Sequence, residues 1–532
     1  MRHLHSPQEA AQWLKAQVRG VLHTDSRRVT PGDGFIAWPG AATDGRRHVP
    51  AALAQGATAC LVEHAQVNAF DDLFDQALKA TDPSTPQAIA SYADLKAASG
   101  PIAAAYYEQP SQALDVLAIT GTNGKTSTAW WLAHALGRVG QRCAVVGTLG
   151  VGELDRLEVT GMTTPDPVLL QARMRDMVTR GVQACAIEAS SIGLAEHRLD
   201  GTHVRVALFT NFTQDHLDYH GSMADYWQAK AALFNWPGLA AAVVNTDDAY
   251  GAQLAQQLSP RDDVVLWTVG IVADASHADA LGTASQLQAT QPVHNIAATQ
   301  QARRVQATHV RHGARGLSFD VVEGAHRHTL HTALVGHYNV SNVLGVIAGL
   351  RALGHSLADA VQACADLPAV PGRMQALGNA EQPLVVVDYA HTPDAVAQAL
   401  TALRPLAHTR GGALVCVLGC GGERDAAKRP LMAAAAEQYA DRVVLTSDNP
   451  RHDDPATILA HMLAGLARPH AVQHILDRAQ AIACSVRDAS VHDVVLVAGK
   501  GHEDYQDVQG VKLPFSDVAH AQAALQTWRA HA

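Results

Sequence analysis

The stretch DVLAITGTNGKTSTAWWLAHALG, residues 115–137, decides the fold of this chain. Its apolar run Val116–Ile119 predicts a strand, and the residues from Thr126 onward predict a helix. A short loop that contains two glycines lies between them. In such an arrangement the backbone N–H groups at the helix N-terminus point into one concavity and attract phosphate. The stretch therefore predicts a nucleotide phosphate site at the end of a strand.

The loop also carries side chains that suit this chemistry. Lys125 adds a positive charge, and Thr126 adds a hydroxyl that suits a phosphate-bound Mg²⁺. A full Walker A motif has a further glycine at the position of Ile119, so this GxxGKT loop is shorter. A plain turn that needs glycine only for its backbone freedom is the alternative interpretation. The residues expected to hold the nucleotide phosphates are Gly121, Thr122, Asn123, Gly124, Lys125, Thr126 and Ser127.

Length and composition restrict the classes of protein. A chain of 532 residues exceeds what one hydrophobic core serves, and its 48% of hydrophobic residues can bury several cores. The formal net charge is −10, with acidic and basic residues mixed along the chain. This mixture argues against a general nucleic-acid binder. We therefore expect small-molecule substrates, no nucleic-acid partner and a monomer.

The sequence also indicates a compartment. No apolar run reaches membrane-spanning length, and the N-terminus lacks a signal-peptide pattern, so we expect a cytoplasmic protein without a membrane span. The seven cysteines are dispersed and odd in number, which is typical of reduced thiols. Cys416 and Cys420 lie at a predicted strand end, where we expect small buried residues rather than a metal pair.

The order of apolar runs and helical patterns predicts an α/β protein with three domains. Residues 1–93 predict a small N-terminal α/β domain, whose residues 71–87 read as a polar, partly flexible connection. Residues 94–372 contain nearly continuous apolar strands, which predict a P-loop-like, doubly wound, mostly parallel sheet. Within them, the tract 271–330 predicts an antiparallel or irregular excursion. Residues 373–532 alternate strand and helix again and predict a Rossmann-like domain with ligands at the carboxyl ends of its strands.

Polar segments follow two strands of the central domain. One places Glu188 at a strand end, and the other, NFTQDHLDYHG, carries Asp215 and His216. Carboxylate and imidazole groups beside a phosphate loop suit a hard cation that bridges phosphate oxygens. Turn chemistry explains any one of these residues alone, but their joint occurrence favours a metal and nucleotide site.

Ten ordered motifs, which cover nearly the whole chain, resemble those of the Mur ligases of peptidoglycan precursor synthesis. They are ITGTNGKT, EASS, NFTQDHLDYHG, YWQAKAALF, GHYNVSNVLGVIA, PGRM, DYAHTPDA, GCGGERDAAKRP, SDNPR and GKGHEDYQ. The chain is most similar to the branch that adds diaminopimelate as the third residue of the stem peptide. The resemblance implies an ATP-dependent ligase that joins meso-2,6-diaminopimelate to UDP-N-acetylmuramoyl-L-alanyl-D-glutamate through an acyl phosphate.

The resemblance also implies roles for individual residues. Lys125, Glu188, His216 and Lys230 are implied to be catalytic, and Lys230 is implied to carry a carbamate. By its local pattern alone, Lys230 would be an ordinary exposed helix lysine. The implied Mg²⁺ ligands are Thr126, Glu188, His216 and Lys230, and the implied contacts to the ATP base and ribose are Asn342, Arg373, Asp388 and His391.

The implied contacts to the muramoyl substrate come from two domains. Ser26 is implied to contact the nucleotide part, and the dipeptide contacts are Thr163, Thr164, Ser190, Glu196 and Arg198. Two positions depart from the family pattern, which commonly has histidine at Ile192 and glutamine at Glu196. These departures affect the expected contacts to the muramoyl peptide rather than the catalytic set.

The third domain is expected to select the incoming amino acid. Arg451 can bind a carboxylate with two parallel hydrogen bonds, whereas lysine would place an ammonium against it. Arg451 thus argues against a lysine-adding relative. The first domain, which contains the segment DSR at residues 25–27, argues against a folylpolyglutamate-synthase-like ligase. A non-catalytic nucleotide-binding scaffold is a more distant alternative. The pocket implied by the resemblance consists of Arg424, Asp448, Asn449, Pro450, Arg451, Gly499 and Glu503.

Overall fold

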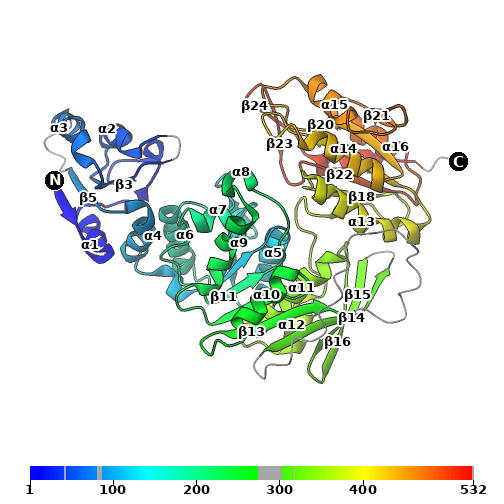
Figure 1. Ribbon diagram of the computed structural model, residues 1–532, viewed down its shortest axis with the longest axis horizontal. Helices are drawn as coiled ribbons and strands as arrows, with labels where there is room; N and C mark the ends of the chain where they lie inside the picture. Colours follow the sequence, from blue (N-terminus) through cyan, green and yellow to red (C-terminus); the bar gives the residue numbers. More distant parts are fainter. Residues whose placement is uncertain (41–42, 81–86, 273–301, 314–315, 530–532) are drawn as a thin grey trace. The chain divides into compact units, whose positions relative to one another are not determined.

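A computed structural model describes residues 1–40, 43–80, 87–272, 302–313 and 316–529 (Figure 1). Its internal contacts divide the chain into two compact units. The first consists mainly of Met1–Gly270 and Leu344–Ala363, and the second mainly of Gln306–Val343 and Cys364–Ala532.

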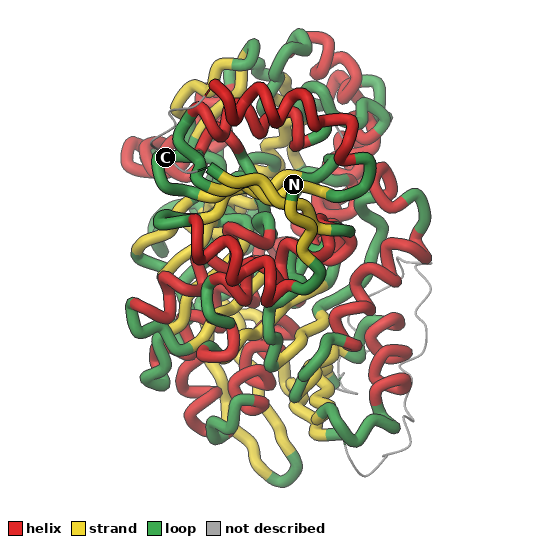
Figure 2. The backbone as a smooth tube through the Cα atoms, turned by 90° about the vertical axis from the view of Figure 1, so that its left-hand side faces the viewer, coloured by secondary structure: helices red, strands yellow, loops and turns green. Residues whose placement is uncertain are grey.

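The N-terminal sheet of the first unit is parallel throughout, in the strand order β1-β5-β4-β3-β2. Neighbouring residues of β4 enter different apolar cores: Leu61 packs with α1 and α4, and Val62 packs with α2 and α3. Helices therefore cover both faces, and Figure 2 shows the N-terminal strands between them. The strands are β1 (Arg2–Leu4), β2 (Leu22–His23), β3 (Gly34–Ala37), β4 (Ala59–Glu63) and β5 (Ala88–Tyr92). The helices are α1 (Pro7–Gln17), α2 (Val49–Ala54), α3 (Asp71–Ala80) and α4 (Leu95–Tyr106).

Helix α3 corrects one prediction, because residues 71–80 were expected to form a polar, partly flexible connection. Phe74 is buried, and Phe70 stacks on it with ring centroids 5.8 Å apart. Ala77 packs against the same core. The prediction was wrong because Phe74, Ala77 and Leu78 hardly change the polar composition of the segment, yet their spacing places them on one helical face. Residues 81–86 lie outside the described residues.

The central sheet of the first unit has the order β13-β12-β11-β6-β10-β7-β8-β9, parallel except for the hairpins that add β8 and β9. Its strands are β6 (Asp115–Thr120), β7 (Cys143–Gly147), β8 (Gly150–Glu153), β9 (Arg156–Glu158), β10 (Ala184–Glu188), β11 (Val206–Phe209), β12 (Ala241–Asn245) and β13 (Val265–Ile271). Its helices are α5 (Lys125–Arg138), α6 (Pro167–Thr179), α7 (Ser191–Ala195), α8 (Leu217–His220), α9 (Met223–Ala231) and α10 (Ala249–Leu258). Helices α11 (Tyr338–Ala352) and α12 (Leu357–Cys364) follow later in the chain.

The register of this sheet places three strand ends at one level. Ile119 of β6 pairs with Glu188 of β10, and Thr120 pairs with Phe209 of β11. The loops that follow β6, β10 and β11 therefore leave the same edge of the sheet side by side.

The tract 271–330 is antiparallel where the structure describes it. Strands β14 (Arg303–Gly313), β15 (Gly316–Glu323) and β16 (His326–Thr332) form two successive antiparallel pairs. Residues 273–301 of this tract lie outside the described residues, and so do Ala314 and Arg315.

The C-terminal sheet in the second unit has the order β17-β18-β22-β19-β20-β21, parallel except for β17. Alternate residues of β19 enter two cores: Cys416 packs with α13, α14 and α15, and Val417 packs with α16 and α17. The strands are β17 (Gln375–Leu377), β18 (Leu384–Asp388), β19 (Leu414–Cys420), β20 (Arg442–Ser447), β21 (Gln473–His474) and β22 (Val494–Ala498). The helices are α13 (Pro393–Arg410), α14 (Lys428–Tyr439), α15 (Pro455–Leu463), α16 (Arg478–Arg487) and α17 (Asp517–Thr527), and β23 (Tyr505–Val508) and β24 (Val511–Pro514) form a hairpin.

The predicted α/β class and the parallel-rich sheets are confirmed. Cys416 and Cys420 are both buried in β19, as expected of small core residues. The domain boundaries at 93 and 372 remain predictions, and helix α4, which follows the first of them, contributes Ile102 to the N-terminal core. Within the described ranges, no helix combines the length and the apolar character needed to cross a membrane.

A buried ion pair connects helices α16 and α17 of the C-terminal domain, and it gives a test of stability. Arg478 and Asp517 are fully buried, with two N···O distances of 2.7 Å, and Arg478 also donates to the carbonyl of Ala498. We expect Asp517→Ala to lower the free energy of unfolding by about 3–5 kcal/mol, because it leaves a buried guanidinium uncompensated. Denaturant unfolding would measure this loss, and Asp488→Ala, in the exposed pair with Arg487, is the control. Equal losses in the two variants would contradict the argument.

Candidate active site

The predicted phosphate loop joins β6 to α5. Gly124 has φ +86°, and a Cβ on Gly121 would lie 1.9 Å from the Thr210 hydroxyl oxygen. Both positions therefore require glycine. The backbone N–H of Asn123 donates to the Asn211 side chain at 2.9 Å, so this amide is already paired. The N-terminus of α5 directly follows this loop, and N–H groups in the first turn of a helix are suited to bind phosphate.

Lys125 folds back over this loop. Its Nζ donates to the carbonyls of Gly121 at 2.9 Å and Thr122 at 2.8 Å. The ammonium is thereby held at the loop, where it can offset phosphate charge.

A buried carboxylate lies beside the loop. Glu188 is 2% exposed, and its Oε2 accepts a hydrogen bond from the Thr126 hydroxyl at 2.9 Å. Its Oε1 accepts from the backbone N–H of Thr148 at 2.8 Å. The hydrogen bond from Thr126 joins the end of β10 to the start of α5. Glu188 and Thr126 are two of the four residues that the resemblance implied as metal ligands.

Gly147 makes room for this carboxylate. A Cβ at this position would lie 2.2 Å from Oε1 of Glu188. Any side chain here would displace the carboxylate. Gly147 and Thr148 were missed by the sequence analysis, although Gly147 ends strand β7 and Thr148 follows it, at the same edge as Glu188.

Four of the predicted dipeptide contacts gather around the same strand end. The Thr164 hydroxyl donates to the Glu188 carbonyl at 2.7 Å and lies 2.9 Å from the Ser190 hydroxyl. Arg198 donates to the Thr164 carbonyl at 3.0 Å. Thr163 lies 3.1 Å from Thr148, hydroxyl to hydroxyl. These residues form one polar network that continues from Glu188.

Lys230 is 1% exposed, so its local helix pattern gave a wrong expectation of an exposed side chain. Its Nζ donates to the Gly121 carbonyl at 2.7 Å and lies 4.5 Å from the centroid of the Tyr226 ring. The Tyr226 hydroxyl lies 3.2 Å from that of Thr122, which also places this tyrosine at the loop. Burial lowers the pKa of Lys230 well below its ordinary value, and the Lys125 ammonium adds to this effect.

His216 begins helix α8 with φ +52°, a left-handed conformation that is uncommon outside glycine. Burial lowers its pKa, and although Asp215 opposes this, Lys125 and Lys230 lower it further. The lowered pKa favours the neutral form of the imidazole. Among the described residues, no three His, Cys, Asp or Glu side chains converge into a metal site by themselves.

Glu196 and Ser26 lie elsewhere in the first unit. Burial raises the pKa of Glu196, but hydrogen bonds from Lys96 and Tyr219 outweigh it, and the net pKa is lowered. Its Oε2 lies 2.6 Å from Lys96 Nζ, so the carboxylate at this position is paired with a positive charge. Ser26 is buried at the start of a short 3₁₀ helix, Ser26–Arg28.

The residues predicted to hold the ATP base and ribose lie in the second unit. Asp388 ends β18 and accepts from the backbone N–H of Met374 at 2.7 Å. Burial raises the pKa of Asp388, and the Arg373 guanidinium opposes this. Arg373 lies over the Tyr389 ring at 4.5 Å, and His391 Nδ1 lies 2.7 Å from the Tyr389 carbonyl. The fourth, Asn342 on α11, is buried and donates to the side chain of Asn339 at 3.0 Å.

The predicted amino-acid pocket assembles at the carboxyl ends of β19, β20 and β22. Arg451 has φ +51° and is held there because its backbone N–H donates to the Asp507 carbonyl at 2.9 Å. Its guanidinium donates to the Gly422 carbonyl at 2.7 Å. A Cβ on Gly421 would lie 3.1 Å from Arg451 Nη1 and 3.7 Å from the Arg424 side chain, so both arginines border this glycine.

Asn449 follows β20 and Glu503 follows β22, and both were predicted for the same pocket. Asn449 Nδ2 donates to Glu503 Oε2 at 2.8 Å. A Cβ on Gly499 would lie 2.4 Å from Asp448 Oδ2, which explains the glycine in this loop. Lys500, which the sequence analysis missed, is fully buried and reaches both Asn449 and Glu503.

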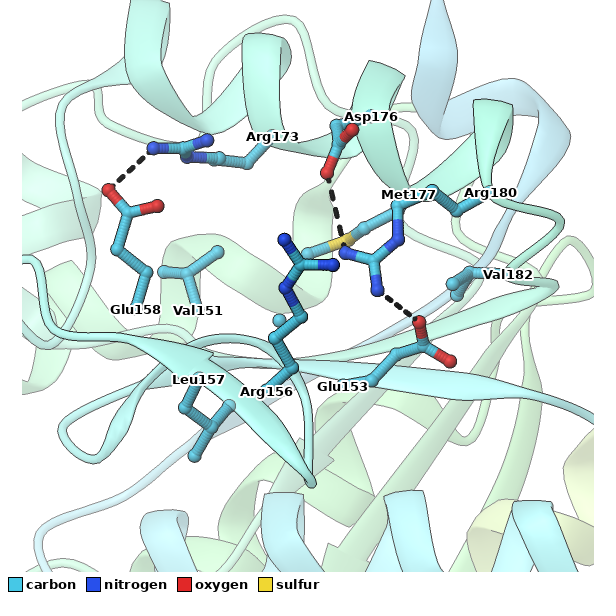
Figure 3. A pocket seen from close by; sticks show the side chains of 11 residues that line it. Val151, Glu153, Arg156, Leu157, Glu158, Arg173, Asp176, Met177, Arg180 and Val182 are labelled. Atoms are coloured by element: carbon cyan, nitrogen blue, oxygen red, sulfur yellow. Dashed lines mark hydrogen bonds and ion pairs between the residues drawn. The ribbon is translucent and has the colours of Figure 1, made fainter.

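A separate cavity of about 270 Å³ lies between the β8–β9 hairpin and α6 (Figure 3). Arg173 pairs with Glu158 at 2.5 Å, and Arg180 pairs with Glu153 at 2.9 Å. These pairs attach the hairpin to the helix. Since none of the predicted site residues lines this cavity, we interpret it as a structural clamp and not as the active site.

A parallel α/β sheet with a phosphate loop beside a buried carboxylate defines a nucleotide-dependent α/β enzyme. Three family models match the chain in order: "Mur ligase family, catalytic domain" over residues 20–107, "Mur ligase middle domain" over 119–350, and "Mur ligase, glutamate ligase domain" over 372–501. The chain belongs to the Mur ligase family.

Individual relatives agree with this membership. The UDP-N-acetylmuramoyl-L-alanyl-D-glutamate–2,6-diaminopimelate ligase of Acidovorax is 55% identical over 525 residues, which cover 97% of each chain. A solved structure of a ligase with the same name has a TM-score of 0.61 at 32% identity and covers 95% of this chain and 94% of its own. The MurF ligase of Thermotoga maritima, solved in complex with ADP, has a TM-score of 0.58 at 16% identity, with coverage of 95% and 97%, and shows the fold alone.

The position of Gly147 gives a test of this site. We expect Gly147→Ala to reduce phosphate release from ATP by about a hundredfold, because a displacement of roughly 1 Å at a catalytic group has an effect of this size. The matched control is Gly137→Ala in α5, where a Cβ would meet nothing within 4 Å. Steady-state rates of the two variants would be compared, and an unimpaired Gly147→Ala enzyme would remove Glu188 from the reaction.

Proposed function

We propose that the chain is an ATP-dependent amide ligase that joins meso-2,6-diaminopimelate to UDP-N-acetylmuramoyl-L-alanyl-D-glutamate. The names of its closely similar full-length relatives support this activity. The observation that carries the choice of amino acid is Arg451, held in a left-handed conformation two residues after Asn449, which itself donates to Glu503. An arginine and a carboxylate in one pocket suit a ligand centre that bears both a carboxylate and an ammonium.

In this proposal the first unit activates the substrate carboxylate. Lys125 and the N-terminus of α5 bind the ATP phosphates, and the D-glutamyl carboxylate of the substrate attacks the γ-phosphorus. The bond from that phosphorus to ADP breaks, and an acyl phosphate forms. The amine of diaminopimelate then attacks the acyl carbon, loses a proton and expels inorganic phosphate, which leaves the amide. Thr163, Thr164, Ser190 and Arg198 are proposed to orient the dipeptide.

The residues at the loop fit a magnesium ion. Thr126 and Glu188 provide hydroxyl and carboxylate oxygens, which Mg²⁺ prefers, and both lie at the phosphate-binding helix terminus. When bound, Mg²⁺ would neutralise phosphate charge during transfer. His216 is proposed as a ligand of a second ion.

Lys230 is proposed to carry a carbamate. Its lowered pKa favours the neutral amine, whose nitrogen can attack CO₂ and then lose a proton, so that a cationic side chain becomes an anionic oxygen ligand. Its Nζ already lies 2.7 Å from the Gly121 carbonyl of the phosphate loop. A carbamate there would offer oxygen atoms to a metal beside the phosphates.

The second unit is proposed to supply the remaining contacts. Asn342, Arg373, Asp388 and His391 would contact the ATP base and ribose. Arg424, Asp448, Asn449, Arg451, Gly499 and Glu503 would form the diaminopimelate pocket, with Pro450 shaping the turn. Ser26 of the first unit would contact the uridine diphosphate. We place the reaction in the cytoplasm, where ATP and UDP-linked sugars are found, and propose that the protein is a monomer.

A lysine-adding ligase is the alternative within this family. It is disfavoured because the terminal ammonium of lysine would face the Arg451 guanidinium without a carboxylate between them. A non-catalytic scaffold is disfavoured because the buried Lys230 and Glu188 occupy positions that nucleotide binding alone does not require.

Replacement of Arg451 tests the choice of amino acid. Phosphate release would be followed with ATP, Mg²⁺ and the UDP-muramoyl dipeptide, with either meso-diaminopimelate or L-lysine. We expect the wild type to prefer diaminopimelate, and Arg451→Ala to lose about a hundredfold in kcat/KM for it, since an unpaired charge-assisted contact costs about 2–5 kcal/mol. Arg487→Ala, an exposed arginine in α16, is the control. A wild type that uses both amino acids equally would contradict the proposal.

Replacement of Lys230 tests the carbamate. We expect Lys230→Ala to lose about a hundredfold or more in turnover, because each factor of ten corresponds to about 1.4 kcal/mol of lost charge stabilisation. Short carboxylic acids should restore part of the rate, since they can supply the missing oxygen ligand. Lys79→Ala, an exposed lysine in α3, should behave as wild type. Full activity, or inactivity without rescue, would exclude the carbamate.

A further inference from the structure

Lys500 is a buried charge for which the proposed chemistry has no direct use. Its side chain is fully buried, and its Nζ donates to Asn449 Oδ1 at 2.9 Å and to Glu503 Oε2 at 3.0 Å. Burying an ammonium is costly unless it is paired and hydrogen-bonded. Both of these polar partners belong to the proposed diaminopimelate pocket, so the buried ammonium lies directly behind residues of that pocket.

The ammonium fixes the orientation of the Asn449 amide. Oδ1 accepts from Lys500 and also from the backbone N–H of Asp507 at 2.9 Å. Two donors at this atom require it to be the oxygen, so Nδ2 must face Glu503. Without Lys500, one of the two donors that hold this orientation would be lost.

The same ammonium offsets the charge of Glu503. Oε2 of Glu503 accepts from both Lys500 and Asn449, which fixes the carboxylate plane. The Lys500–Glu503 pair is neutral as a unit, while the nearby Arg451 remains cationic. A ligand end that carries only an ammonium therefore meets little net attraction. A ligand end that also carries a carboxylate can pair with Arg451.

We propose that Lys500 is a positioning residue that sets the preference for a distal centre with both carboxylate and ammonium over a terminal ammonium alone. This inference rests on the proposed function. It acts through Asn449 and Glu503, because Lys500 has no exposed surface with which to touch a ligand. Its removal should weaken the oriented contacts to diaminopimelate and also restore the full negative charge of Glu503, which favours lysine. Both effects lower the preference for diaminopimelate over lysine.

The experiment compares kcat/KM for meso-diaminopimelate with that for L-lysine in the wild type, Lys500→Met and Lys500→Gln. We expect the ratio to fall by at least about tenfold in both variants, while KM for ATP stays within about twofold, because only the oriented pocket changes. Lys512→Met is the matched control. Lys512 also lies over the Tyr505 ring, at 4.2 Å, but on the exposed strand β24, so its ratio should equal that of the wild type.

The outcomes separate this inference from the proposed function. A wild type without diaminopimelate-dependent phosphate release would overturn the proposed function itself. An active wild type whose ratio is unchanged in a folded Lys500 variant would overturn only the role of Lys500. Lys500→Gln keeps a polar head group without the charge, so it decides the question if Lys500→Met does not fold. Failure of both variants to fold would assign Lys500 to stability and also overturn the inference.

A double variant tests whether Lys500 acts through Glu503. Lys500→Met combined with Glu503→Gln should lower the ratio by less than the sum of the two single losses, because part of the effect of Lys500 passes through that carboxylate. Fully additive losses would mean that Lys500 acts independently of Glu503 and would contradict the proposal.

Discussion

The parallel pairing of β6 between β10 and β11 is the constraint on which the active site depends. Because Ile119 lies opposite Glu188 and Thr120 lies opposite Phe209, three loops leave the sheet at one level. Parallel strands bring residues from distant parts of the chain to one edge in this way. Gly121, Glu188 and the segment from Thr210 to His216 are close to one another for this reason alone.

Buried charges lie at the ends of strands in both units. Glu188 ends β10 and Lys500 lies just after β22. Glu188 accepts hydrogen bonds from neighbouring segments, and Lys500 donates them. A charge removed from water needs such partners, so its position is fixed by the surrounding framework. Fixed charges of this kind stabilise developing charge without further rearrangement during a reaction. Both sheets thus hold a buried charge at a strand end, one beside the proposed phosphate site and the other beside the proposed amino-acid pocket.

The part of the site that could be predicted lies in continuous motifs. The strand, loop and helix around Lys125 were predictable because the apolar run and the glycines are local signals. Gly147 and Thr148 were overlooked although they also lie at the end of a strand, since neither residue type suggests chemistry by itself. Helix α3 was overlooked because its apolar face consists of a few residues in a polar segment.

The sequence by itself determined the order of strands and helices, the phosphate loop and the family to which the chain belongs, because these depend on local patterns and on ordered motifs. Only the tertiary structure decided which charges are buried. Lys230 reads as an exposed helix residue until α9 packs against the phosphate loop, and the orientation of Asn449 is set by Lys500 and Asp507, more than fifty positions away. Burial and hydrogen-bond partners arise from contacts between distant segments, which no local pattern records.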